Sequence, residues 1–176
     1  MQSPMINHMD RIVGAASEAA ITLDGQTCTA LLDSGSTVST VSESYYKEVL
    51  GSKDIHPLGE LLNVEGAAGQ RLPYSGYVEV EVGMPHMDDT VTGLLLVVPD
   101  TRYAQQVPAI LGTNILSLIM DGLRKQHGVR YAQVCSLESS WTVAFRCMAI
   151  QHKAAEKSNG MLCVLKSKSR SKIVIP

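Results

Sequence analysis

The sequence predicts a mainly β protein, and three observations lead to that prediction. Its aliphatic residues are mainly Val, Leu and Ile, within a chain of 176 residues that is 45% hydrophobic, and β-branched side chains favour strands. Short apolar or alternating runs recur between turn signals over the first two thirds of the chain. One clear helical pattern follows, after Gly112.

The first elements come from residues 21–51. The segment ITLDGQTCTALLD (21–33) predicts a hairpin, because Asp24-Gly25 between two strand-like runs is typical of a type I′ turn. Its second run ends in two leucines directly before Asp33. STVSTVSES (36–44) suits a short strand, and residues 42–51 fit one or two helical turns between Ser42 as N-cap and Gly51 as stop.

Further strands are expected over residues 61–111. In 61–83, valines alternate with Glu79 and Glu81, the period of a half-buried strand, and the small residues EGAAG (65–69) predict a hairpin tip. Residues 92–100 and 107–111 read as buried strands. The helix is expected to be capped by Thr113 or Asn114 and to end at Gly128. Its predicted apolar face consists of Ile115, Leu118, Ile119 and Leu123.

After residue 128 the patterns weaken. VRYAQV (129–134) and WTVAFRCMAI (141–150) could be strands, although residues 141–152 could equally be helical. KAAEKSNG (153–160) resembles a linker or turn, and residues 161–176 read as a strand, a basic patch and a last apolar run. We therefore expect one domain over residues 1–127 and a poorly defined basic extension over residues 128–176.

Composition excludes several classes of protein. No apolar run reaches the ~20 residues of a membrane span, and the N-terminus lacks the basic start and apolar stretch of a signal peptide, so a cytoplasmic protein is expected. The four cysteines (Cys28, Cys135, Cys147, Cys163) lack zinc spacing and are expected to be free thiols. Formal charge is −9 up to Met120 and +7 from Asp121, which suggests two parts of different character.

The stretch LLDSGSTVS (31–39) allows two interpretations of Asp33. Asp, Ser and Gly together suit an Asx-turn between strands. The same residues at the end of a buried strand suit a catalytic carboxylate, because Gly35 permits close backbone approach and the Ser34 and Ser36 hydroxyls can hold the loop. Two such carboxylates close together must share a proton.

The order of strand-Asp-Ser-Gly, Gly-tipped hairpin and Ile-Leu-Gly before a helix resembles the retropepsins, aspartic proteases of retroviruses and LTR retrotransposons, especially the gypsy-type group. The resemblance covers about residues 11–127. It implies a closed β-barrel that supplies half an active site, with Asp33 catalytic. It also implies that Ser34 ties two loops together and that Gly35 and Ser36 complete the motif. A substrate-binding flap is implied at Gly66, Ala67, Ala68 and Gly69, and a strand under the active site at Ile110, Leu111 and Gly112.

The resemblance also implies partners. With one Asp-Ser-Gly motif per chain, catalysis requires a homodimer that binds an extended peptide or polyprotein and needs no metal or cofactor. Many retroviral members carry an Asp-Arg ion pair where this chain has Thr37 and Thr113. The alternative is a catalytically silent dimerisation or peptide-binding module. The basic run Lys166 to Lys172 has no interleaved aromatic residue, so we do not expect a nucleic-acid partner. No membrane partner is expected either, because no apolar run is long enough to span a bilayer. Residues 128–176 resemble the segment leading toward reverse transcriptase.

Overall fold

The computed structural model describes residues 14–59, 61–135, 139–159 and 172–175. In chain order the strands are β1 (Glu18–Leu23), β2 (Gln26–Leu32), β3 (Ser39–Ser42), β4 (Asn63–Gly66), β5 (Gly76–Gly83), β6 (Val91–Val98), β7 (Ala109–Leu111) and β8 (Lys172–Ile175). The α-helices are α2 (Glu43–Tyr45), α3 (Thr113–His127), α4 (Tyr131–Cys135) and α5 (Ser139–Asn159), with short helical turns η1 (Tyr46–Leu50), η2 (Tyr103–Gln105) and η3 (Gly128–Arg130).

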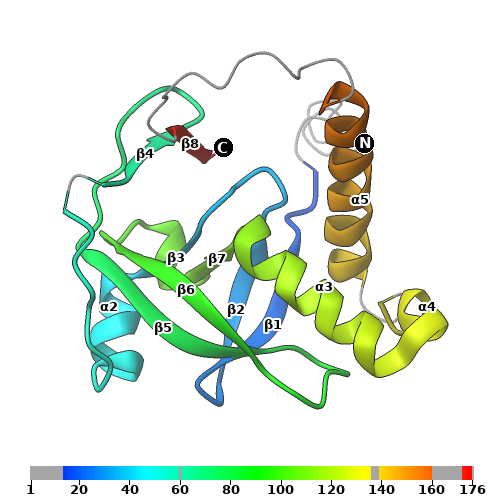
Figure 1. The fold of residues 1–176 in the computed structure, drawn as a ribbon. Helices are drawn as coiled ribbons and strands as arrows, with labels where there is room; N and C mark the ends of the chain where they lie inside the picture. Colours follow the sequence, from blue (N-terminus) through cyan, green and yellow to red (C-terminus); the bar gives the residue numbers. More distant parts are fainter. Residues whose placement is uncertain (1–13, 60, 136–138, 160–171, 176) are drawn as a thin grey trace, which may run out of the picture.

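Six strands close into a barrel in the order β1-β2-β7-β3-β6-β5, and β5 pairs back with β1 (Figure 1). The β2–β7 and β3–β6 pairs are parallel and the others are antiparallel. On β5, Val78, Val80 and Val82 are at most 1% exposed while Glu79 and Glu81 face solvent, as the alternation predicts. The predicted mainly β, closed barrel followed by a helix is confirmed.

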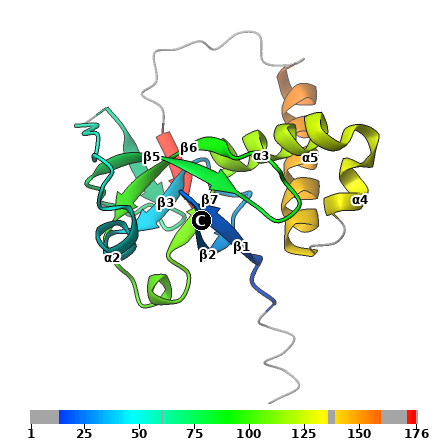
Figure 2. The same ribbon diagram turned by 90° about the horizontal axis from the view of Figure 1, so that it is seen from below.

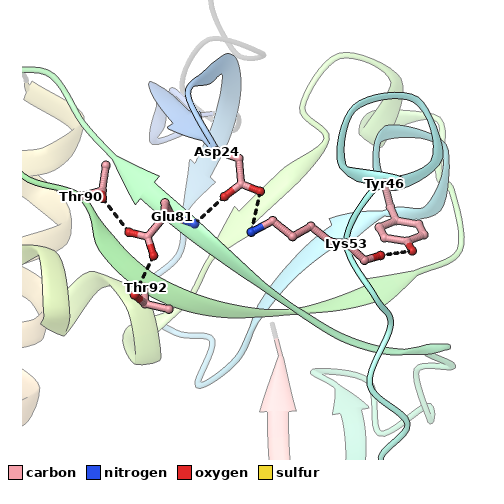
Figure 3. A network of polar contacts seen from close by, with 6 residues as sticks. All are labelled: Asp24, Tyr46, Lys53, Glu81, Thr90 and Thr92. Atoms are coloured by element: carbon pink, nitrogen blue, oxygen red, sulfur yellow. Dashed lines mark hydrogen bonds and ion pairs between the residues drawn. The ribbon is translucent and has the colours of Figure 1, made fainter.

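The β1–β2 hairpin has the predicted turn. Asp24 and Gly25 have φ of 48° and 79°, the two positive values that a type I′ turn requires. The Asp24 carboxylate accepts a bond from the Glu81 backbone N–H at 2.8 Å and pairs with Lys53 at 3.2 Å. Figure 3 shows this network, which fastens the turn to β5 at the end of β2 remote from Asp33.

The helix α3 differs from expectation in its cap and in one face residue. Gly112 occupies the N-cap position with no side-chain cap bond, so neither predicted residue caps α3. Leu116 is buried and Leu118 is 43% exposed. At 3.6 residues per turn the four buried positions span an arc of about 100°, and Leu118 lies outside it. The helix ends at Gly128, as predicted.

Helices replace two elements expected to be irregular or extended. Residues 131–135 form α4 rather than a strand, and the predicted linker over 153–159 is the end of α5. On α5, Trp141 is fully buried and its ring lies 5.7 Å from that of Phe145. Both belong to the same core as the barrel strands. Figures 1 and 2 show α5 beside α3 at one side of the barrel. The division into a domain over residues 1–127 and an extension over residues 128–176 stays a prediction.

Several predictions concern residues outside the described ones: the leader segment before Gly14, and the strand and basic run over residues 161–171. Cys28 and Cys147, whose side chains are described, are free thiols, and burial raises the pKa of Cys28. Among the described residues, no helix is long and apolar enough to cross a membrane, and no group of His, Cys, Asp or Glu is placed to hold a metal ion.

Candidate active site

Asp33 directly follows β2, which lies between β1 and β7 in the barrel sheet. Leu31 and Leu32 pair with Ile110 and Leu111 in the parallel β2–β7 ladder. The Asp33 backbone N–H donates to the Leu111 carbonyl at 2.9 Å. The backbone of Asp33 is therefore fixed by the strand beneath it, and its half-buried side chain starts from a rigid position.

The Asp33 carboxylate organises its own loop through one oxygen. The Gly35 N–H donates to Oδ1 at 2.9 Å, and the Ser36 N–H donates to the Asp33 carbonyl at 3.2 Å. The loop therefore forms the Asx-turn of the first interpretation of Asp33. Among the described residues Oδ2 has no hydrogen-bond partner. The turn and a catalytic role are therefore compatible, because the turn uses only one of the two oxygens.

The loop contacts Gly112, the residue between β7 and α3, so closely that only glycine fits there. A Cβ on Gly112 would lie 2.2 Å from the Val38 carbonyl oxygen and 2.9 Å from that of Ser36. The Thr113 N–H donates to the Ser36 carbonyl at 2.8 Å. The Asp33 loop and the start of α3 are thus locked together by backbone contact at the Ile-Leu-Gly segment.

Two buried hydroxyls complete the support of the loop. The fully buried Ser36 donates from Oγ to the Val38 carbonyl at 2.7 Å. Ser39 Oγ accepts from the Gly112 N–H at 2.9 Å and donates to Asn114 Oδ1 at 2.7 Å. The Asn114 amide in turn donates to the Leu94 carbonyl at 3.1 Å. This chain of bonds connects β3, β7, α3 and β6 beneath the loop.

Ser39 and Asn114 were not predicted as site residues. Asn114 was interpreted as a helix cap, which is the usual role of Asn before a helix. The available signal was its place two residues after Gly112, next to a strand that has to contact the Asp33 loop. Nothing in the local pattern marks Ser39, because a buried serine in a short strand is ordinary.

The remaining residues of the loop, and Thr113 next to it, are half-buried or exposed. Ser34 is half-buried, and its hydroxyl has no hydrogen-bond partner among the described residues; Gly35 and Thr37 are exposed. Thr113 is half-buried, and its carbonyl accepts from the Ser117 hydroxyl at 2.7 Å. Threonine side chains carry no charge, so Thr37 and Thr113 cannot form the ion pair that many retroviral members have at these positions.

The Gly66–Gly69 segment forms the tip of a hairpin. The Gly69 N–H donates to the Gly66 carbonyl at 2.8 Å, and Gly69 has φ of 78°. Ala67, Ala68 and Gly69 are exposed, and Gly66 is buried. A small apolar cluster centred on Val38, Val64 and Leu96 joins the start of this hairpin to the Asp33 loop and β6. The hairpin and the loop are therefore neighbours through Val38 and Val64.

A surface cavity of about 600 Å³ lies elsewhere, between the start of β6 and α3. Its lining includes Met87, Asp89, Leu118 and Asp121, and it does not include the Asp33 loop. Because the Asp33 loop does not line this cavity, the cavity is not part of the candidate site.

Comparisons with known proteins find likeness of fold only. The retroviral protease-like domain of Ddi1 from Leishmania major is 15% identical, with a TM-score of 0.44 over 60% of this chain and 78% of that chain. EIAV protease, in complex with the inhibitor HBY-793, is 16% identical, with a TM-score of 0.43 over 61% and 90%. Lpg0085 from Legionella pneumophila, of unknown function, is 15% identical, with a TM-score of 0.36 over 58% and 84%.

No family model matches the chain. No curated protein matches it either. Because the three TM-scores lie below 0.5, function has to be argued from the residues of the site themselves.

Proposed function

We propose that the protein is an aspartic endopeptidase that acts as a homodimer, with one Asp33 from each chain at a two-fold axis. One observation carries the proposal: Asp33 stands at the end of an interior strand, on a loop fixed by contact with Gly112, and one of its carboxylate oxygens has no partner in the described part of the chain. A fixed carboxylate with a free oxygen is what a water-activating dyad needs from each chain.

In the proposed mechanism the two Asp33 carboxylates bind one water molecule and share one proton, because two like charges at contact distance do not both ionise. The ionised carboxylate takes a proton from the water while the protonated one donates to the scissile carbonyl. The free Ser34 hydroxyls are suited to bond across the two loops. The hairpins tipped by Gly66–Gly69 would cover an extended peptide and exclude water. Processing of a retroelement polyprotein is the corresponding biological role.

The test combines cleavage with sedimentation. The purified protein should cleave an unstructured peptide library at acidic pH, with inhibition by a statine-type transition-state mimic, and should sediment as a dimer at micromolar concentration. Asp33→Asn should lower the rate by at least about 10²-fold without changing the sedimentation. Asp54→Asn, an exposed aspartate outside the loop, is the matched control and should cleave like the wild type.

Two outcomes would contradict the proposal. A strict monomer cannot assemble the dyad. Equal activity in the wild type and Asp33→Asn would show that Asp33 is not the reacting group. If both proteins dimerise and bind peptide uncleaved, the silent peptide-binding module is the better description.

A further inference from the structure

Strand β4, which begins the hairpin tipped by Gly66–Gly69, lies outside the barrel ladder. It pairs in parallel with β8 at the C-terminal end of the described chain, in a separate two-stranded sheet. The register places Val64 opposite Ile173 and Glu65 opposite Val174. Figure 1 shows this sheet at the end of the barrel toward which the β2–β3 connection projects. A segment far along the chain thus sits on the hairpin that stands next to the Asp33 loop.

The hydrogen bonds of the hairpin show which edge of β4 holds β8. The Leu72 N–H donates to the Val64 carbonyl and the Gly66 N–H donates to the Gln70 carbonyl, both at 2.8 Å. Backbone groups alternate sides along a strand. Glu65, the bridge partner of Arg71 between these bonds, therefore directs its own N–H and C=O to the opposite edge. That edge is the one on which β8 lies.

An unpaired strand edge is a template for an extended chain. Strand addition supplies affinity through main-chain bonds, with little demand on sequence. The β4 edge lies on the hairpin joined to the Asp33 loop through Val38 and Val64, so a peptide on that edge would lie on the hairpin next to this loop. The resident β8 therefore occupies a position that a peptide would use.

We propose that residues 172–175 are an autoinhibitory strand, which occupies the outer edge of β4 in the same chain and competes there with an extended peptide. That the competing peptide is a substrate rests on the proposed function; the occupancy itself does not. Charge favours this occupant, because the chain up to Met120 carries a formal −9, while β8 carries the positive Lys172 and no acidic residue.

The parallel direction of β8 agrees with such a site. A two-fold axis that crosses a bound peptide makes the two β4 strands of a dimer run in opposite directions along it. One peptide then meets one β4 in parallel and the other antiparallel. Parallel pairing on a single chain is thus one of the two arrangements that a peptide adopts in the proposed dimer.

The register also supplies a matched pair of variants. In a parallel ladder a residue bonds to the two residues that flank its partner. Glu65 therefore bonds to residues 173 and 175, and Val174 directs its N–H away from β4. Ile175→Pro removes a donor to the Glu65 carbonyl and places a ring against β4, whereas Val174→Pro removes an N–H that faces away.

The experiment measures amide hydrogen exchange by NMR in the full-length protein. The Glu65 amide should exchange roughly tenfold faster in Ile175→Pro than in the wild type, since the loss of a backbone bond opens the ladder. Val174→Pro should match the wild type. Equal exchange in all three proteins would overturn the proposal. Protection that grows with protein concentration would also overturn it, because the occupant would then be a second copy.

Competition is measured with a fluorescein-labelled pentapeptide KIVIP, the sequence of residues 172–176, by fluorescence anisotropy. The peptide should bind Ile175→Pro several-fold more tightly than Val174→Pro, because the edge is vacated only in the first. Equal affinities would overturn the competition. Neither measurement depends on catalysis. A protein that cleaves no peptide, but whose Glu65 amide exchanges faster in Ile175→Pro, would contradict the proposed function and still support this inference.

Discussion

Replacing Gly112 by alanine tests the contact between the Asp33 loop and β7 most directly. The added Cβ would lie 2.2 Å from the Val38 carbonyl oxygen and 2.7 Å from the Val38 carbonyl carbon. Both are backbone atoms and cannot rotate away. The loop or β7 therefore has to move by roughly 1 Å in a close-packed region.

That displacement has a cost that can be estimated from the structure. Overpacking of a buried site costs about 1–3 kcal/mol. The Gly112 N–H bond to Ser39 Oγ, at 2.9 Å in a buried place, is strained by the same movement, and an unsatisfied buried donor costs about 1–3 kcal/mol. We expect Gly112→Ala to lower the free energy of unfolding by about 2–6 kcal/mol.

The assay is urea and thermal unfolding, with Gly122→Ala as control. At Gly122, within α3, the nearest atom to an added Cβ is the flexible Met87 sulfur at 3.3 Å. Alanine is the better helix former there by up to about 1 kcal/mol. The melting temperature should fall by about 6–12 °C for a 3 kcal/mol loss in Gly112→Ala and should hold or rise in the control. A loss below about 1 kcal/mol in Gly112→Ala would refute the account of the loop.

Two further predictions concern the core and a surface carboxylate. Trp141→Ala should destabilise the protein by about 3–5 kcal/mol in urea unfolding. Trp141→Phe should lose less, because the buried indole N–H has no hydrogen-bond partner among the described residues. A loss below about 0.5 kcal/mol for Trp141→Ala would contradict the packing of α5. Hydrogen bonds from the Thr90 and Thr92 hydroxyls lower the pKa of Glu81 (Figure 3). The pKa of Glu81 is lower in the folded protein than in the unfolded chain. The stabilisation from these bonds is therefore present above the unfolded-state pKa and is lost as the pH falls through the folded-state pKa. Glu81→Gln should therefore have a lower melting temperature than the wild type at neutral pH, and the difference should shrink as the pH is lowered. A difference that does not change with pH would show that the ionised Glu81 carboxylate is not its cause.

The barrel could be predicted because its signals are local. Asp24-Gly25, the alternating valines of β5 and the short run of β7 each specify an element by turn chemistry or period. The Asp33 loop followed from its place after Leu31-Leu32. These signals need no knowledge of the partner strand, which is why the mainly β class and the late helix were predicted correctly.

The helix α5 was left undecided for a specific reason. Its buried residues Trp141, Ala144, Phe145 and Met148 follow the spacing i, i+3, i+4, i+7 of a helical face. Exposed apolar residues off that face, such as the 68% exposed Ile150, fill the gaps and imitate a continuous strand. The β4–β8 pairing had no local signal at all, since a parallel register between distant segments is set by tertiary structure.

The Asp33 loop combines groups that neighbouring residues hold in place with groups that have no partner in the described chain. Contacts from below fix Gly112, Ser36 and Ser39 through backbone and buried hydroxyls. The groups without partners in the described chain, Asp33 Oδ2 and the Ser34 hydroxyl, lie among the half-buried side chains of the same loop. Such support stabilises the fold whatever the loop does, and it also holds the Asp33 carboxylate in one position. In the proposed dimer this rigidity would place each Asp33 carboxylate before the two chains meet, which favours a proton shared between them.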